Sequence, residues 1–434
     1  MDQTYMKKEN VLKLLITMVL PMVISMLVNS LYNIVDSFFV AQISEDAMTA
    51  ISLVFPMQNF INSVMIGFGI GINSVISFYM GAQDKVQADK AASQGILLAT
   101  IHGIVMTAGC IMLIKPFLCM FTNDSSIVEL GLQYSYIAFA FSTILAWQLV
   151  FEKTFQAVGR MTASMTAMLG GCITNIVLDP MLIFGIGIFP DLGIRGAAIA
   201  TGIGQTVSLL VYVIIYILRP MPVRFTRKCM KPEKTLCLKM YSVGIPASLN
   251  MALPSLLISA LNVILAAFSQ TYVFVLGVYY KLQTFLYLPA NGVVQGMRPL
   301  IGYNYGAGEH KRVKKIYSTA TIIVLIIMCA GTAICLGIPD KLIGLFTTNA
   351  NTISAGAKAL RIISAGFIVS SVSVTASGAL EGLGKGLPSL VISVFRYAVI
   401  IIPVAFILSR IYEVNGVWWS FGVTELVTAF ISYI

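Results

Sequence analysis

Long uninterrupted runs of apolar residues dominate the pattern of this chain. Twelve such runs alternate with short polar segments, at residues 12–39, 51–79, 93–114, 128–150, 161–188, 196–218, 242–268, 272–297, 316–338, 354–378, 388–409 and 416–434. Each run is near or above the roughly 20 residues that a helix needs to cross the hydrocarbon core of a bilayer. The runs lack the alternation of outer-membrane strands, so helices are favoured over a barrel. The pattern predicts an all-α integral membrane protein with twelve transmembrane helices.

The two halves of the chain match each other at a fixed separation of 225 residues. Leu20-Pro21 recurs as Ile245-Pro246, whereas Gly196-Ala197 recurs as Gly416-Val417, so the second copy has lost five residues. Six helices per copy is an even number, so both copies begin and end on the same side and the repeats are parallel. We therefore predict two six-helix bundles around a central cleft. The predicted parts are an N-lobe at residues 1–218, a basic cytoplasmic linker at 219–240 and a C-lobe at 241–434.

Composition and charge agree with a membrane protein and indicate its orientation. The chain is 58% hydrophobic and 11% charged, whereas a soluble domain carries roughly 25% charged residues. Most Lys and Arg residues fall on the N-terminal side of the predicted helices, and the opposite loops hold only Lys115, Arg195, Lys341 and Arg410. This asymmetry predicts a multi-pass protein of the cell (cytoplasmic) membrane with both termini in the cytoplasm. The net charge of +10 is then mostly a topology signal, and no soluble basic domain exists to bind nucleic acid.

The sequence offers no enzyme chemistry. It has no Walker loop and no nucleophile-base pair, and its seven cysteines are scattered without metal-ligand spacing. We therefore predict no catalytic residue, no enzyme activity and no cofactor. An ion gradient, of H⁺ or Na⁺, is the natural source of energy for such a chain.

Two acids interrupt the apolar runs of the first copy. Asp36 lies in the outer half of the first predicted helix and Asp179 in the outer half of the fifth. An acid in the bilayer costs roughly 2.5–3.5 kcal/mol on insertion scales, so such residues usually have a function. Their counterparts in the second copy are Leu261 and Val404, which are apolar. A purely structural role would not obviously be confined to one lobe.

Polar residues surround this acidic pair. They are Asn29 and Asn33 on the first helix, Asn175 on the fifth and Thr201 on the sixth. Asn29, Asn33 and Asp36 share one helix face, and Asn175 lies one turn before Asp179. Pro180 also leaves the Ile176 carbonyl without its helical donor. Such an oxygen cluster can hold a proton between carboxylates or coordinate sodium. The alternative is a polar network that only locks the three helices together.

Other polar residues are candidates for a substrate cavity. We predict that Asn59, Asn62 and Gln283 line it together with Asn29 and Asn33, although each could equally bond a neighbouring helix. Pro21 removes a backbone hydrogen bond and offers the first helix a place to bend. Near the cytoplasmic ends of two further helices we expect Glu152, Glu381 and Lys385 to form solvated pairs, with closing contacts between the lobes as the alternative.

Several short motifs, in order, carry a family resemblance. They are Leu20-Pro21, Asn33–Ser37, Gly81-Ala82, Gln156–Gly159, Asn175–Pro180, Gly196–Thr201 and Gly416–Trp418. The chain resembles the multidrug and toxic compound extrusion (MATE) exporters, and among them the MepA-like branch. In that family, residues that match Asp36, Asn175, Asp179 and Thr201 form the cation site of the N-terminal lobe. The chain departs from members with acids in the seventh and eighth helices, because it has Lys281 and Gln283 there, which argues against a sodium site in the C-lobe.

The resemblance implies a cation-coupled antiporter, driven by protons and/or sodium, that exports amphipathic and often cationic drugs and toxic compounds by alternating access. Its expected partners are these small molecules and the lipid bilayer, and we expect a monomer. The alternative is a flippase for a lipid-linked sugar precursor, whose basic cavity would use Lys281, Lys358, Arg361 and Arg396. A membrane scaffold is a third possibility, but it leaves the acidic cluster unexplained.

Overall fold

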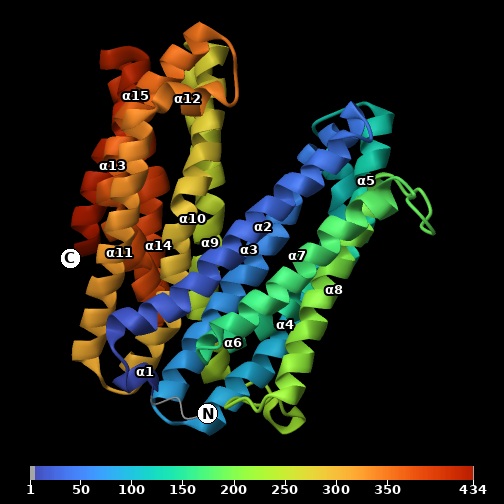
Figure 1. Cartoon of the computed structure of the whole chain (residues 1–434), viewed down its shortest axis with the longest axis vertical. Helices are drawn as coiled ribbons and strands as arrows, with labels where there is room; N and C mark the ends of the chain where they lie inside the picture. The colour runs from blue at the N-terminus through green and yellow to red at the C-terminus, as the bar shows by residue number, and fades with distance from the viewer. Residues whose placement is uncertain (1–4, 434) are drawn as a thin grey trace.

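The computed structural model describes residues 5–433, which form two helical lobes with no strand in the described range (Figure 1). The first lobe contains α1 (Tyr5–Lys8), α2 (Val11–Ala41), α3 (Glu45–Gly81), α4 (Lys85–Cys119), α5 (Ser125–Ala140), α6 (Ser142–Ala157), α7 (Met161–Ile183) and α8 (Ile194–Leu218). After a 3₁₀ turn at Arg227–Cys229, the second contains α9 (Lys234–Ala266), α10 (Gln270–Gly306), α11 (His310–Gly337), α12 (Pro339–Gly344), α13 (Ala350–Gly382), α14 (Gly386–Val394) and α15 (Ile401–Tyr433). The predicted all-α membrane fold with two repeats is confirmed.

The membrane-spanning helices of the structure are consistent with the apolar pattern, although they do not by themselves give all twelve predicted crossings. Nine helices in the described range are long and apolar enough to cross a membrane, or ten if α5 and α6 form one span. The segment from Gly386 to Ser432 counts once among them, although Tyr412 and Glu413 leave the helical conformation. A Cβ atom on Gly416 would lie 2.0 Å from the carbonyl oxygen of Leu408, whereas residues eight apart in a straight helix are separated by about 12 Å. The chain therefore folds back here, which is consistent with the two separate crossings that the sequence predicts.

The apolar run at 128–150 departs most from its prediction as one helix. The structure has two helices, α5 and α6, which meet at an angle of 44° at Phe141. The Thr107 hydroxyl donates a hydrogen bond of 2.9 Å to the carbonyl oxygen of Phe139, and the Phe141 ring packs on Gly202 of α8. A side chain that enters the ladder of backbone hydrogen bonds kinks a helix. Hydrophobicity alone cannot reveal such a bend.

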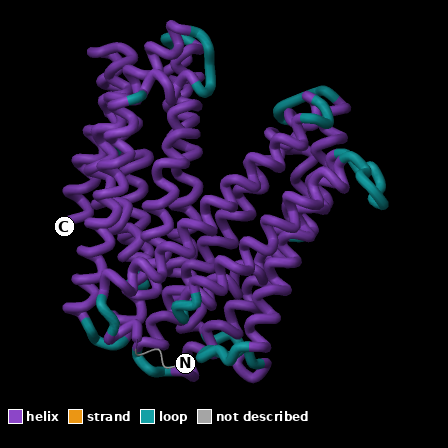
Figure 2. Tube along the Cα trace, in the orientation of Figure 1, coloured by secondary structure: helices purple, strands orange, loops and turns teal. Residues whose placement is uncertain are grey.

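Backbone contacts between the lobes follow the sequence duplication. A Cβ atom on Gly81 would lie 1.8 Å from the carbonyl oxygen of Tyr303, and one on Gly306 would lie 2.0 Å from that of Phe78. Both pairs are related by the offset of 225 residues, so the lobes meet around a pseudo-twofold axis. The contacts lie at the end of the molecule that carries the N-terminus, where Asn304 also bonds the Met6 carbonyl. The helices diverge toward the opposite end (Figures 1 and 2).

The first long helix of each lobe, α2 or α9, begins in the hydrophobic core of the other lobe. Residues 14–22 of α2 supply Leu14, Leu15, Met18 and Met22 to the hydrophobic cluster of the second lobe. Leu236 and Met240 of α9 pack in the cluster of the first lobe. The later part of α2 contacts α7 of its own lobe. The helix thus bridges the two lobes, with Pro21 near the point of transfer and Asp36 on the part that contacts α7.

The segment after α8 is tied to the first lobe. Arg160 donates hydrogen bonds to the carbonyl oxygens of Arg219 and Pro220, at 3.3 and 2.5 Å. On α4, Asp89 accepts from the Arg224 amide, and Gln94 bonds the backbone of Lys231 and Glu233. The basic linker therefore lies along the end of α4 before α9 begins.

We expect Glu413→Gly to stabilise the protein. Glu413 has φ 52° and ψ −138°, and its counterpart in the first copy is Gly193, with φ 52° and ψ −131°. A non-glycine residue in such a conformation costs roughly 1–3 kcal/mol, which exceeds the extra backbone entropy that glycine loses on folding. The unfolding temperature of the purified variant should rise in a thermal-shift measurement. Asn415→Gly, two residues away with ordinary φ, should give no gain, and equal shifts for both variants would contradict the strain.

Candidate cation and substrate site

The structure brings the four predicted cation-site residues together between α2, α7 and α8. Asn175 Nδ2 donates hydrogen bonds to Asp179 Oδ1, at 3.2 Å, and to Thr201 Oγ1, at 3.3 Å. The side chains of Asp36 and Asp179 lie within hydrogen-bonding reach of each other. Asp179 is fully buried and Asp36 is partly buried. One cluster therefore contains two carboxyls, an amide and a hydroxyl.

Several oxygen atoms of this cluster lack a donor. Asp36 Oδ1, Asp179 Oδ2 and Asn175 Oδ1 are buried and have no hydrogen-bond partner among residues 5–433. A buried acceptor without a donor costs free energy, and a buried carboxylate costs more. Two ionised carboxylates are acceptors only, so they can bond each other only if one carries a proton. The geometry therefore fits a cation, either a proton shared by the acids or a sodium ion held by these oxygens.

Two tyrosines near the acids were not predicted. Tyr32 and Tyr134 lie close enough to Asp36 and Asp179 to interact with them electrostatically, and Tyr134 is 3% exposed. Tyr32 precedes Asp36 by four residues, so helical spacing could have identified it. Tyr134 is on α5, and nothing in the sequence connects it with the first helix.

A cavity of about 390 Å³ lies beside the acidic cluster in the first lobe. The predicted cavity residues Asn29, Asn33 and Asn62 line it together with Asn175 and Thr201. Asn33 Nδ2 donates to the Asn29 carbonyl, at 2.6 Å. The acidic cluster thus meets the cavity through the amide of Asn175 and the hydroxyl of Thr201.

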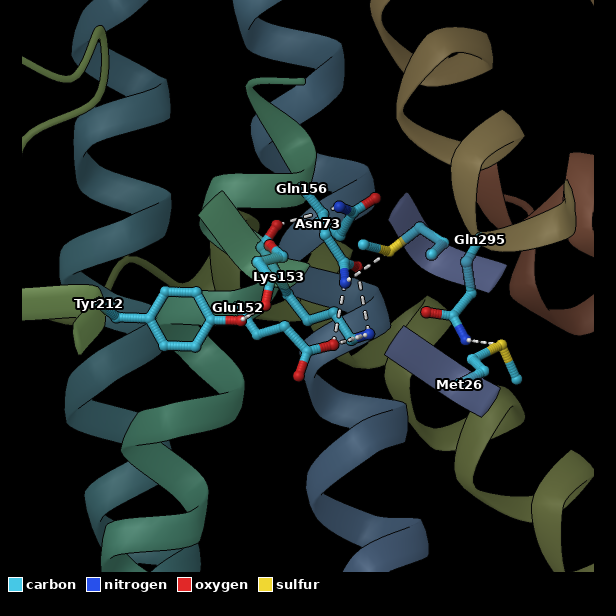
Figure 3. Close-up of polar contacts among 9 residues, drawn as sticks. Met26, Asn73, Glu152, Lys153, Gln156, Tyr212 and Gln295 are labelled. Atoms are coloured by element: carbon cyan, nitrogen blue, oxygen red, sulfur yellow. Dashed lines mark hydrogen bonds and ion pairs between the residues drawn. The ribbon is translucent and has the colours of Figure 1, made fainter. Parts of the chain in front are cut away.

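A second cavity, of about 570 Å³, lies in the second lobe. Gln283 lines it, whereas Asn59 is partly buried on α3 and lines neither cavity. Four residues line both cavities: Met26, Ile66, Met251 and Gln295. Gln295 of the second lobe reaches Met26 of the first, with 3.3 Å between Nε2 and Sδ (Figure 3). The two cavities therefore adjoin each other where the lobes meet, with these four residues between them.

Buried ionic groups line the inner ends of both cavities. In the first lobe Lys153 Nζ lies 2.7 Å from Glu152 Oε1, and Gln156 bonds both residues, at 2.9 and 3.2 Å (Figure 3). In the second lobe Arg298 pairs with Glu381 at 2.6 Å. The side chains of Glu152, Lys153 and Glu381 are 5%, 6% and 4% exposed.

The expectation of solvated pairs at Glu152 and Glu381 was therefore wrong. Both acids are buried and pair within their own lobes, so they are not contacts that close one lobe on the other. Of the three predicted residues, only Lys385 is exposed, and it forms no ion pair in the described part of the chain. Position near a helix end does not determine exposure in a duplicated fold, because the lobes bury one face of these ends against each other.

The basic residues that a flippase would use are not gathered in the cleft. Lys281, Lys358 and Arg361 are exposed, and Arg361 pairs with Asp340 at 3.2 Å. Only Arg396 lines a cavity, and it is paired with Glu425 at 2.6 Å. Glu425 was not predicted as a site residue, although a lone acid in an apolar run is the same signal that identified Asp36. Within residues 5–433, no group of three or more His, Cys, Asp or Glu side chains could hold a metal ion.

These features define a membrane transporter with two equivalent lobes around a cleft. The family model MatE matches the chain twice, over residues 21–181 and 246–407. The two matches begin 225 residues apart, which is the separation of the repeat. The chain therefore belongs to the MatE family, whose members are transporters and not enzymes.

Curated relatives and solved structures agree with this assignment. The multidrug export protein MepA of Staphylococcus aureus (strain NCTC 8325 / PS 47) is 27% identical over 428 residues, 98% of this chain and 93% of the relative. MepA of Staphylococcus haemolyticus is 25% identical over 429 residues, which are 99% of this chain and 94% of the relative. A structure described as the outward-facing conformation of a multidrug resistance MATE family transporter of the MOP superfamily superposes with a TM-score of 0.93. It is 25% identical, and the match covers 100% of this chain and 96% of that one.

Proposed function

We propose that this protein exports amphipathic, often cationic compounds across the cell membrane in exchange for protons or sodium ions. The observation that carries the proposal is the cluster of Asp36, Asn175, Asp179 and Thr201, whose unpaired oxygens adjoin a cavity that opens into the cleft. Relatives over the whole length are named multidrug export proteins, which supports the class of substrate.

The cycle that we propose is alternating access between the lobes. The contacts at Gly81 and Gly306 close the side that carries the N-terminus, and the excess of basic residues on that side places it in the cytoplasm. The conformation described here is then open to the outside. The helix α2 couples the cation cluster to the rearrangement, because its two parts pack in different lobes and Pro21 lacks the amide hydrogen that would stiffen it.

The flippase alternative is not favoured. A headgroup with phosphates needs several cations in the cavity, and three of the four candidate residues lie outside it. The basic residues that do line the cavities, Lys153, Arg298 and Arg396, are each paired with a glutamate. The cavity of the first lobe instead contains amides beside an acidic cluster, which suits cations and neutral polar groups.

Efflux from proteoliposomes tests the proposed coupling. Purified protein would be reconstituted with a fluorescent cationic dye, and either a proton gradient or a sodium gradient would be imposed alone. We expect one or both gradients to drive dye transport, and an ionophore specific for that ion should stop it. Transport at the same rate without any gradient would contradict antiport.

We expect drug and coupling ion to compete for the first lobe. When both acids are charged, the site requires a cation, and a unit pair at 4 Å is worth about 4 kcal/mol at an effective dielectric of 20. If protons or sodium removed a third of that attraction, a cationic drug would bind roughly tenfold more weakly. Linkage requires the drug to weaken ion binding by the same factor. Drug affinity in detergent between pH 5 and 8, with and without sodium, measures this, and a flat affinity across both variables would rule out direct competition.

A further inference from the structure

We propose that the cavity of the second lobe is a separate ligand site for aromatic compounds that carry an anionic group. Arg396 would bind the anionic group. The inference concerns binding, and it rests on the proposed function only in placing the site on a transport pathway. The cavity is the larger of the two described here, at about 570 Å³, and it has no counterpart of the acidic cluster.

Arg396 presents unused hydrogen-bond donors at this cavity. It lies in a π-helical turn, Phe395–Val399, between α14 and α15, and such turns are frequent at functional sites. Its Nε and Nη2 lie 2.8 and 2.6 Å from Glu425 Oε1, and its guanidinium lies 5.3 Å from the Tyr397 ring centroid. A guanidinium has five N–H groups, so three of them have no acceptor among residues 5–433. The Arg396 side chain is nevertheless only 10% exposed.

Other donors in the same cavity lack partners as well. The hydroxyls of Tyr280 and Thr424 and the Nε of Arg298 are buried without a hydrogen-bond partner in the described range, and all three residues line the cavity. A buried donor without an acceptor costs free energy. A carboxylate offers acceptors for several such donors at once, and its bond to a guanidinium is charge-assisted. Two acceptors in this cavity, Asn250 Oδ1 and Glu381 Oε2, also have no hydrogen-bond partner in the described range, although Arg298 lies 2.6 Å from Glu381 Oε2. Unpaired donors therefore outnumber unpaired acceptors here, whereas the cluster in the first lobe has unpaired acceptors.

The walls of the cavity favour an aromatic ligand. Tyr280, Tyr287, Tyr397 and Phe421 line it, and their repeat counterparts in the first copy are Phe55, Asn62, Cys172 and Thr201. Arg396 and Glu425 correspond to Gly171 and Gln205, which carry no charge. Three of the four aromatic residues thus stand where the first copy has a small or polar residue, and the ion pair stands where it has uncharged residues. Aromatic walls bury much apolar area while keeping polar atoms in place.

Glu425 holds Arg396 in place and competes with the ligand. Its Oε1 accepts from the guanidinium, and its Oε2 accepts from Ser373 at 3.3 Å. A ligand carboxylate that uses the remaining N–H groups lies near the Glu425 charge and is repelled by it. Glu425→Gln keeps the shape and removes this repulsion, so the variant should bind an anionic ligand more tightly.

Binding of one fluorophore in a charged and a neutral form tests the site. The probes are dansylglycine and its neutral amide, and fluorescence titration of the full-length protein in detergent gives their dissociation constants. We expect the acid to bind at least tenfold more tightly than the amide. Arg396→Gln/Glu425→Gln removes both charges without leaving either one unpaired, and it should weaken binding of the acid at least tenfold while leaving the amide unchanged. Glu425→Gln alone should strengthen binding of the acid several-fold.

Equal affinities for acid and amide in the unmodified protein would overturn the site, and so would unchanged binding of the acid by Arg396→Gln/Glu425→Gln. If the double variant fails to fold, Glu425→Gln still decides, because unchanged or weaker binding of the acid contradicts the assigned repulsion. Glu129→Gln, which removes an exposed carboxylate of the first lobe, should leave binding of the acid unchanged. Since no gradient is applied, failure of cation coupling and failure of this site give separate results.

Discussion

Asp36→Asn is expected to abolish gradient-driven efflux while leaving the protein folded. Asparagine keeps the size of the side chain and can bond Asp179, but it cannot carry the charge that a proton or sodium ion neutralises. The coupled cycle then has no ion to release. Initial rates of dye efflux from proteoliposomes, compared at equal protein content, should fall to the level of empty liposomes, and Asp179→Asn should behave alike.

A matched control separates this effect from a loss of acid charge in general. Glu129→Gln removes an exposed carboxylate of the same lobe, on α5, whose partner is Gln133 at 3.2 Å. This variant should retain the full rate. The unfolding temperature of Asp36→Asn should not fall, because the change removes a buried negative charge that lacks a full set of donors. A well-folded Asp36→Asn protein with full gradient-dependent efflux would refute the assignment.

The fold could be predicted from the sequence because bilayer and duplication constrain it strongly. Apolar runs indicate where a helix contacts hydrocarbon, so they predict that a helix exists. They do not predict the residues at which the helix begins and ends. The helix α4 begins at Lys85 because Asp84 caps it, although apolar residues dominate only later. The bend at Phe141 depends on Thr107 of another helix, and the exchange of α2 and α9 between the cores depends on tertiary packing. None of these is a local property of the sequence.

The candidate site was predictable where a rare residue marks it. Asp36 and Asp179 are conspicuous in apolar runs, and helical spacing then leads to Asn175. Burial of the ionic groups was not predictable in this way. Glu152 and Glu381 lie at comparable places near helix ends, and only the structure shows that Lys153 and Arg298 neutralise them inside the lobes. Glu425 was overlooked for a different reason. This acid is conspicuous in an apolar run, but its partner Arg396 was considered only as a basic residue of a flippase cavity.

Lys153→Met should destabilise the protein severely, by about 3–5 kcal/mol, because it leaves Glu152 as an unpaired buried charge. Among residues 5–433, only the bond from Gln156, at 2.9 Å, would remain to Glu152. Methionine preserves the apolar stem, which packs so closely on Gly69 that a Cβ atom there would lie 2.8 Å from Lys153 Cγ. The loss would therefore reflect charge and not packing. Thermal unfolding of the purified variant in detergent measures it.

Two further variants determine whether pairing in a dry site is the cause. Glu152→Gln combined with Lys153→Met removes both charges, keeps an amide in reach of Gln156, and should recover most of the lost stability. Lys13→Met breaks an exposed pair with Glu9, in which the side chain of Lys13 is 71% exposed and that of Glu9 is 40% exposed. This variant should change the free energy of unfolding by less than about 1 kcal/mol. If the double variant is as unstable as Lys153→Met alone, the buried charge of Glu152 is not what Lys153 compensates. The two residues would then stabilise the first lobe through their separate contacts, and the inner end of its cavity would tolerate a charge without a partner.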